Sequence, residues 1–159
     1  MGYYKPATIC LNGHVVSYTE ANFAKYCTLC GQATISECPH CHEPIHGVYK
    51  IEAVSSYSKF IREYYCSNCG KPYPWTQRII DSAVEALSND ESLDDETLQI
   101  LKNAIPDLIT ETPQTQISIA KYKRYLDKAD KIVKDALYHV LIDCLCEFAK
   151  MSLFPHNPQ

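Results

Sequence analysis

The sequence predicts an α+β protein in which a small, cysteine-rich β head precedes an α-helical tail with one long C-terminal helix. Two features of its 159 residues predict this division. Seven of the nine cysteines lie between Cys10 and Cys69, among short runs of β-forming residues. Beyond about residue 75, apolar residues recur every three to four positions, as on one face of a helix. We therefore expect a head over residues 1–75 and a tail over residues 76–159.

Three Cys-x-x-Cys pairs indicate that the head binds metal. The pairs are Cys27/Cys30, Cys38/Cys41 and Cys66/Cys69. A pair on a tight turn directs two thiolates at one ion, and a following glycine, here Gly31 or Gly70, permits the turn. Short β-type runs at 8–9, 14–18 and 63–65 complete a pattern that is typical of a zinc ribbon.

Counting ligands predicts two structural zinc ions per chain. The three pairs and Cys10 supply seven thiolates, and a second tetrahedral site needs an eighth ligand. His14 can supply it, because a turn at Gly13 brings the imidazole back towards Cys10. The predicted sites are Cys10, His14, Cys27 and Cys30 for one zinc, and Cys38, Cys41, Cys66 and Cys69 for the other.

An interleaved pairing of these ligands is the alternative. A strict RING arrangement is disfavoured, because the seven residues 31–37 separate the second pair from the third. A cross-braced treble clef, in which Cys10 would share a metal with Cys38 or Cys41, stays open at this point.

The stretch His42-Glu43-Pro44-Ile45-His46 matches the H-E-x-x-H pattern of zinc proteases. That chemistry needs a helix that places both histidines on one face, one turn apart. Pro44 and Gly47 are unsuited to such a helix, and Cys41 directly precedes the motif. We expect His40, His42 and His46 to lie on an exposed loop without a catalytic role.

The tail is predicted as three helical parts. The first helix begins near Pro74 and continues to about Leu87. An acidic connector, 89–112, holds a short helix that we expect to begin at Ser92 and end at Pro106. A long helix then extends from about residue 113 to about residue 153, with an apolar stripe from Tyr122 to Met151.

The length of the last helix predicts either self-association or a fold-back. About forty helical residues span roughly 60 Å, which is more than a small head can cover. Exposing the stripe would be costly, so we expect a homo-oligomer through this helix unless the helix breaks and folds on itself.

A cluster of basic residues lies on the same helix. Its members are Lys121, Lys123, Arg124, Lys128, Lys131 and Lys134. Basic residues beside tyrosines can bind nucleic acid. Asp127 and Asp130 interrupt the cluster, and the formal net charge of the chain is −4. Both facts favour a solvated or intramolecular role.

The cysteine motifs also resemble a known group of proteins. Cys10-x-Asn12-Gly13-His14, followed by Tyr26-Cys27-x-x-Cys30-Gly31, is similar to the opening of many bacterial zinc-ribbon proteins. The later Tyr65-Cys66-x-x-Cys69-Gly70-x-Pro72-Tyr73-Pro74-Trp75 resembles a family of short, uncharacterised bacterial proteins with such a head and a helical tail. The resemblance covers nearly the whole chain. It implies zinc binding in a bacterial cytoplasmic protein, and no established activity.

These features together predict a non-catalytic binding or adaptor module with a protein partner. Eight ligands for two zincs leave no open position for catalysis, and the sequence contains no phosphate loop or Ser-His-Asp grouping. A nucleic-acid-binding zinc ribbon is the second hypothesis. A hydrolase with an additional metal site at His40, His42 or His46 is the third. Without a signal peptide or a membrane-spanning apolar run, we expect a cytoplasmic protein.

Overall fold

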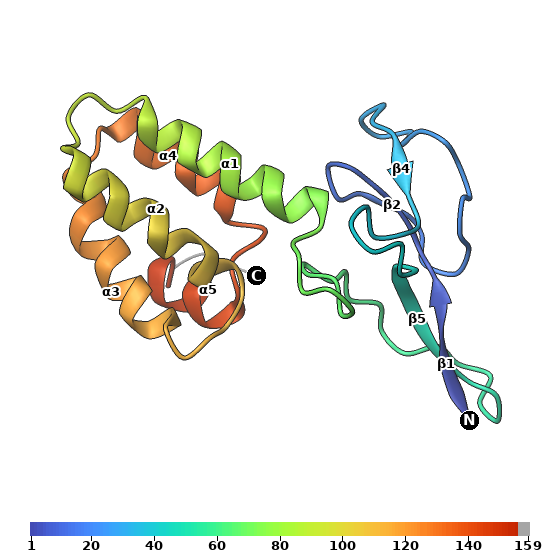
Figure 1. The fold of residues 1–159 in the computed structure, drawn as a ribbon. Coiled ribbons are helices and arrows are strands. Elements are labelled where there is room, and N and C mark those ends of the chain that lie inside the picture. The colour runs from blue at the N-terminus through green and yellow to red at the C-terminus, as the bar shows by residue number, and fades with distance from the viewer. Residues whose placement is uncertain (156–159) are drawn as a thin grey trace. The chain divides into compact units, whose positions relative to one another are not determined.

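The computed structural model describes residues 1–155, which form an α+β protein (Figure 1). The chain divides into two compact units, Met1–Arg78 and a second that begins at Ile79. All strands of the described residues lie in the first unit. The helices begin at Pro74, so the second unit is helical.

The head holds two small antiparallel sheets. Its strands are β1 (Gly2–Pro6), β2 (Thr8–Cys10), β3 (Val15–Ser17), β4 (Thr34–Ile35) and β5 (His46–Ile51). One sheet pairs β1 with β5, and the other has the order β3-β2-β4. The runs expected at 8–9 and 14–18 fall on β2 and β3. The pairing of β1 with β5 was not predicted, because it joins segments that are far apart in the sequence.

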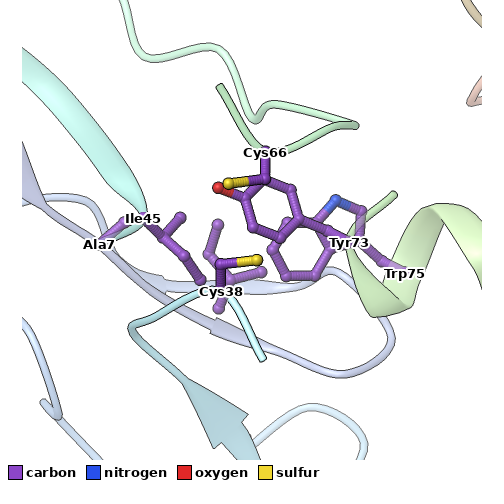
Figure 2. Close-up of a cluster of buried hydrophobic side chains, with 7 residues drawn as sticks. Ala7, Cys38, Ile45, Cys66, Tyr73 and Trp75 are labelled. Atoms are coloured by element: carbon purple, nitrogen blue, oxygen red, sulfur yellow. The ribbon is translucent and has the colours of Figure 1, made fainter. Parts of the chain in front are cut away.

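The core of the head is small and includes two of the metal-ligand candidates. Ala7, Ile9, Ile45, Tyr73 and Trp75 are buried together with Cys38 and Cys66 (Figure 2). The rings of Tyr73 and Trp75 are stacked, with their centroids 4.7 Å apart. The indole N–H of Trp75 donates to the carbonyl of Glu63 at 2.9 Å. The only tryptophan therefore connects the last Cys-x-x-Cys segment to the start of the first helix.

Five helices follow within residues 1–155, and their apolar faces pack against one another. They are α1 (Pro74–Ser88), α2 (Asp95–Ile109), α3 (Thr115–Leu126), α4 (Lys131–Leu141) and α5 (Glu147–Leu153). Leu87, Leu101, Ile105, Leu108 and Leu137 are completely buried. No helix within residues 1–155 is long and apolar enough to cross a membrane.

The prediction of one helix from about 113 to about 153 was wrong, because the chain breaks twice. Asp130 has an extended backbone, and its carboxylate accepts the Ile132 N–H at 3.3 Å, so α4 begins anew there. A second break precedes α5, where the Cys146 N–H donates to the Leu108 carbonyl at 2.8 Å. The breaks fold the stripe back, and Tyr122 and Leu137 are buried within a single chain.

The boundaries of α2 also differ from the prediction. Asp94, not Ser92, caps its start by accepting the Thr97 N–H at 2.7 Å. Pro106 lies inside the helix, which continues to Ile109. The lost hydrogen bond is offset because Leu108 and Ile109 are buried and the Thr110 N–H donates to the Pro106 carbonyl.

Asp90 joins two connections of the helical unit. One of its oxygens accepts hydrogen bonds from the backbone N–H and the hydroxyl of Ser92, at 2.9 and 2.5 Å. The other accepts the backbone N–H of Asp130 at 2.7 Å. The hydroxyl of Ser92 is the main reason that the pKa of Asp90 is lowered. This buried carboxylate thus ties the α1–α2 connection to the turn between α3 and α4.

We expect Asp90→Ala to destabilise the helical unit by about 1–3 kcal/mol, because it removes a charged acceptor from the N–H groups of Ser92 and Asp130. The pKa of Asp90 is lower in the folded chain, so its stabilising effect is complete above the unfolded value of 3.8. This effect is lost as pH falls through the folded pKa, and the difference from wild type should shrink there. Urea unfolding followed by circular dichroism at the helix band measures the effect. Asp143→Ala, at an exposed carboxylate, is the control and should have little effect.

Candidate metal centres

The three Cys-x-x-Cys pairs adopt the same backbone turn. The N–H after the second cysteine donates to the carbonyl of the first, at 2.8 to 2.9 Å, in the pairs Gly31–Cys27, His42–Cys38 and Gly70–Cys66. The donor residue has a left-handed backbone each time, with φ of 73°, 63° and 71° at Gly31, His42 and Gly70. We call each of these turns a knuckle. The knuckle is a local structure, which is why the spacing of the cysteines reveals it.

The first group of ligands contains Cys10, His14, Cys27 and Cys30. Cys10 ends β2, and a left-handed turn at Gly13 returns the chain so that His14 faces it. The Sγ atoms of Cys10 and Cys30 are 3.7 Å apart, and Nδ1 of His14 lies 3.3 Å from Cys30 Sγ. The same nitrogen lies 3.5 Å from Cys10 Sγ and 3.7 Å from Cys27 Sγ. One nitrogen and three sulfurs therefore converge on a common point.

The second group contains Cys38, Cys41, Cys66 and Cys69. The Sγ atoms of Cys38 and Cys69 are 3.7 Å apart, and those of Cys41 and Cys66 are 3.6 Å apart. In both groups all ligand atoms lie within 4.8 Å of one another, so each group can hold a metal ion. The grouping is sequential. Cys10 lies with Cys27 and Cys30, and not with Cys38 or Cys41 as a cross-braced arrangement would require.

The pKa values of several thiols are shifted by the groups around them. The Gln32 backbone N–H lowers the pKa of Cys30 to about 6, and the Asn68 side chain lowers that of Cys41 to about 6. The Lys71 N–H favours the Cys69 thiolate, but burial and the neighbouring thiolates outweigh it and raise the pKa of Cys69 to about 11. Four thiolates this close repel one another, and a divalent cation removes that repulsion.

Side chains that are not themselves ligands support the first group. The Asn12 amide lies 3.6 Å from Cys30 Sγ, and Arg78 donates to the Asn12 amide oxygen at 2.6 Å. Arg62 donates to the carbonyl of Gly13, on the turn that orients His14. Of these supporting residues, only Asn12 lies beside a ligand in the sequence. Arg62 and Arg78 have no signal in the sequence that would have identified them.

The H-E-x-x-H stretch is not helical. His42 occupies the left-handed position of the second knuckle, and Ile45 is buried in the core. His46 begins β5, where its ring stacks on Tyr4 at 4.2 Å and its Nδ1 lies 3.1 Å from a Glu63 oxygen. His40 is exposed. Within residues 1–155, none of these histidines joins a group of metal ligands, and neither do Cys144 and Cys146.

The head is thus a small β module built on two clusters of cysteine-rich ligands, which can form two zinc sites. The chain belongs to the bacterial family described as "Uncharacterized protein conserved in bacteria (DUF2321)", whose family model matches residues 3–153. This confirms the resemblance found in the sequence. No curated protein and no solved structure matches the chain.

The left-handed position of His42 generates a prediction about stability. A residue with a Cβ is strained in this conformation by about 1–2 kcal/mol, and glycine is not. We expect His42→Gly to keep the full metal content and to raise the thermal unfolding midpoint. Gly31→Ala is the matched control, because a methyl group there meets no atom within 4 Å and adds only the strain. It should lower the midpoint. A loss of metal in His42→Gly, measured by elemental analysis, would make His42 a ligand and contradict the assignment.

Proposed function

We propose that the protein is a zinc-stabilised, non-catalytic adaptor of the bacterial cytoplasm that binds a protein partner through its head. The observation that carries this proposal is that each metal group already supplies four ligands. A tetrahedral ion held by four protein ligands has no position left for water or substrate, which is the mark of a structural site.

The distances and ligand types support zinc as the metal. Zinc–sulfur bonds of about 2.3 Å in a tetrahedron place two sulfurs about 3.8 Å apart, and a sulfur and a nitrogen about 3.5 Å apart. The sulfur pairs at 3.6 to 3.7 Å and the His14 contacts at 3.3 to 3.7 Å fit those values. Sets of three cysteines with one histidine, and of four cysteines, are typical of structural zinc. All nine cysteines lie within residues 1–155 and none of them forms a disulfide there, which suits a reducing cytoplasm.

The first knuckle and the segment before it offer a surface to a protein partner. Phe23, Tyr26 and Leu29, which we call the knuckle surface, are 60%, 64% and 77% exposed. A shallow cavity of about 210 Å³ lies beside Tyr26 and is lined in part by Ala24 and Ala33. Large apolar side chains held out from a rigid turn are the kind of group that anchors a protein interface.

The other functions considered from the sequence have less support. The basic cluster is partly engaged within the chain, since the Lys128 ammonium lies 3.4 Å from the Thr97 hydroxyl and Lys134 donates to the Asp127 carbonyl at 3.1 Å. Nucleic-acid binding by this cluster is therefore disfavoured. A hydrolase would need an open metal site, and His42 and His46 lie on different elements with separate contacts.

Self-association through the tail also has less support than the sequence suggested. The fold-back buries most of the apolar stripe, while Ile132, Phe148 and Met151 stay 76%, 43% and 67% exposed. If the protein forms a homo-oligomer, these are the tail side chains that a second copy would cover.

The metal assignment predicts two zinc ions per chain by elemental analysis. One equivalent or none would contradict it. Cys66→Ser should lose zinc and destabilise the head, and Cys146→Ser, outside both groups, should keep two zincs. If Cys66→Ser does not fold, chelation of wild-type protein gives the same information. Removing zinc should expose Trp75, which is now completely buried, and shift its fluorescence to longer wavelength.

The adaptor proposal is tested by capturing partners on the immobilised full chain from a bacterial lysate. Leu29→Asp should reduce capture of a specific partner by about tenfold or more, because it places a charge at the centre of an apolar contact. Ile61→Asp, at an exposed apolar residue elsewhere in the head, should leave capture unchanged. Equal capture by wild type and Leu29→Asp would refute the knuckle surface as the binding site.

A further inference from the structure

One face of the β1–β5 ribbon carries aromatic and basic side chains in alternation. Tyr3 of β1 is opposite Lys50 of β5, and Lys50 forms an antiparallel bridge with Tyr57 on its other side. Opposite residues on paired strands point to the same face, so Tyr3, Lys50 and Tyr57 form one row across the ribbon. Lys5 is on this face as well, since its ammonium lies 5.3 Å from the centre of the Tyr3 ring. We call these four residues the ribbon face.

The ribbon face is open to solvent and hollowed at one end. Tyr3 of β1 is 43% exposed, and Tyr57, in the bridge beside β5, is 49% exposed. A cavity of about 280 Å³ lies between Lys50 and Tyr57, with Ser55 and Ser56 among its lining residues. The hollow lies just below the usual size range of small-molecule pockets, which begins at about 300 Å³.

The charges of this region are mainly positive. Lys5 and Lys50 belong to the ribbon face, and Lys59 is exposed two residues after Tyr57. Glu52 also lines the hollow, but it is paired with the N-terminal amine at 3.9 Å. The chain as a whole has a formal net charge of −4, so this concentration of cations is local.

We propose that the ribbon face binds single-stranded nucleic acid, with Tyr3 and Tyr57 stacking on bases and Lys5 and Lys50 contacting phosphates. Neighbouring strands are about 4.8 Å apart, so the backbones of Tyr3 and Tyr57 are separated by about 10 Å, with the backbone of Lys50 between them. Flat rings that alternate with cations match a polymer in which flat bases alternate with phosphates. A base on Tyr3 displaces the Lys5 ammonium from the ring, which frees it for a phosphate.

This chemistry favours a nucleic acid over an acidic peptide. An acidic peptide would use the lysines but not the exposed faces of two rings. In a duplex, stacking on neighbouring base pairs would bury the base faces that the rings contact. Because every base has such a face, we expect little sequence preference. The proposal is independent of the knuckle surface, which involves other residues.

The test is fluorescence anisotropy with a labelled, mixed-sequence DNA of about 12 nucleotides, a length within the usual range for one small domain. Full-length, zinc-loaded protein should bind it. Tyr57→Ala should weaken binding by about 5- to 150-fold, the cost of losing one stacked base. Tyr57→Phe, which keeps the ring, should restore it. Two phosphate contacts predict a slope of about −1.4 for log affinity against log salt, and Lys50→Ala should reduce this to about −0.7.

The head provides matched controls at the knuckle surface. Tyr26→Ala and Lys25→Ala change an exposed tyrosine and an exposed lysine there, and both should leave binding unchanged. Zinc content checks that every variant is folded. The proposal is overturned if wild-type protein does not bind at about 50 mM salt, or if the Tyr26 and Tyr57 variants weaken binding equally. Displacement by oligoglutamate of equal charge as readily as by unlabelled DNA would also overturn it, in favour of an acidic peptide.

Discussion

The close approach of four metal ligands is the constraint on which the structure of the head depends. Each group gathers its sulfur and nitrogen atoms within 4.8 Å, an arrangement of mutually repelling thiolates that needs a cation. Few side chains are buried around them, and two of these are the cysteines Cys38 and Cys66. A structural zinc contributes about 10–16 kcal/mol to folding, which is as large as the whole stability of an ordinary domain. The metal ligands and the buried core of the head therefore form together, and neither is stable without the other.

The residues around the metal groups also position the start of α1. Arg78 binds Asn12, which contacts the Cys30 sulfur, so this turn belongs to the surroundings of the first metal group. Trp75, one residue into the helix, is buried beside the cysteines of the second. The start of α1 is thus fixed by both groups. This explains why Pro74 begins a helix at this point, where local propensity alone would only permit one.

The sequence was informative where a structure is local and weak where it depends on distant residues. The cysteine pairs, Gly31 and Gly70 predict their turns because a knuckle is closed by a hydrogen bond within a few residues. A break that folds the long helix on itself was one of the two expectations, but the positions of its two breaks were not predicted, although Asp130 interrupts the basic cluster. Its backbone N–H binds Asp90, 40 residues earlier, and no local pattern reports such a contact. Pro106 was misjudged for the same reason, because burial of Leu108 and Ile109 keeps α2 intact.

The ribbon face is the strongest case of a feature that only tertiary structure creates. Its row exists because Tyr3 is opposite Lys50, and a shift of one residue would place Tyr49 there and turn Lys50 to the other side. Strand β5 is also anchored at Gly47, where a Cβ would lie 2.0 Å from the Tyr18 carbonyl, the same carbonyl that accepts the Val48 N–H. Tyr18 directly follows β3, whose partner strand ends in the ligand Cys10. Under both proposals the metal groups have a structural role, and the path from Cys10 through β2 and β3 to the Tyr18 carbonyl is the one that connects the first of them to β5.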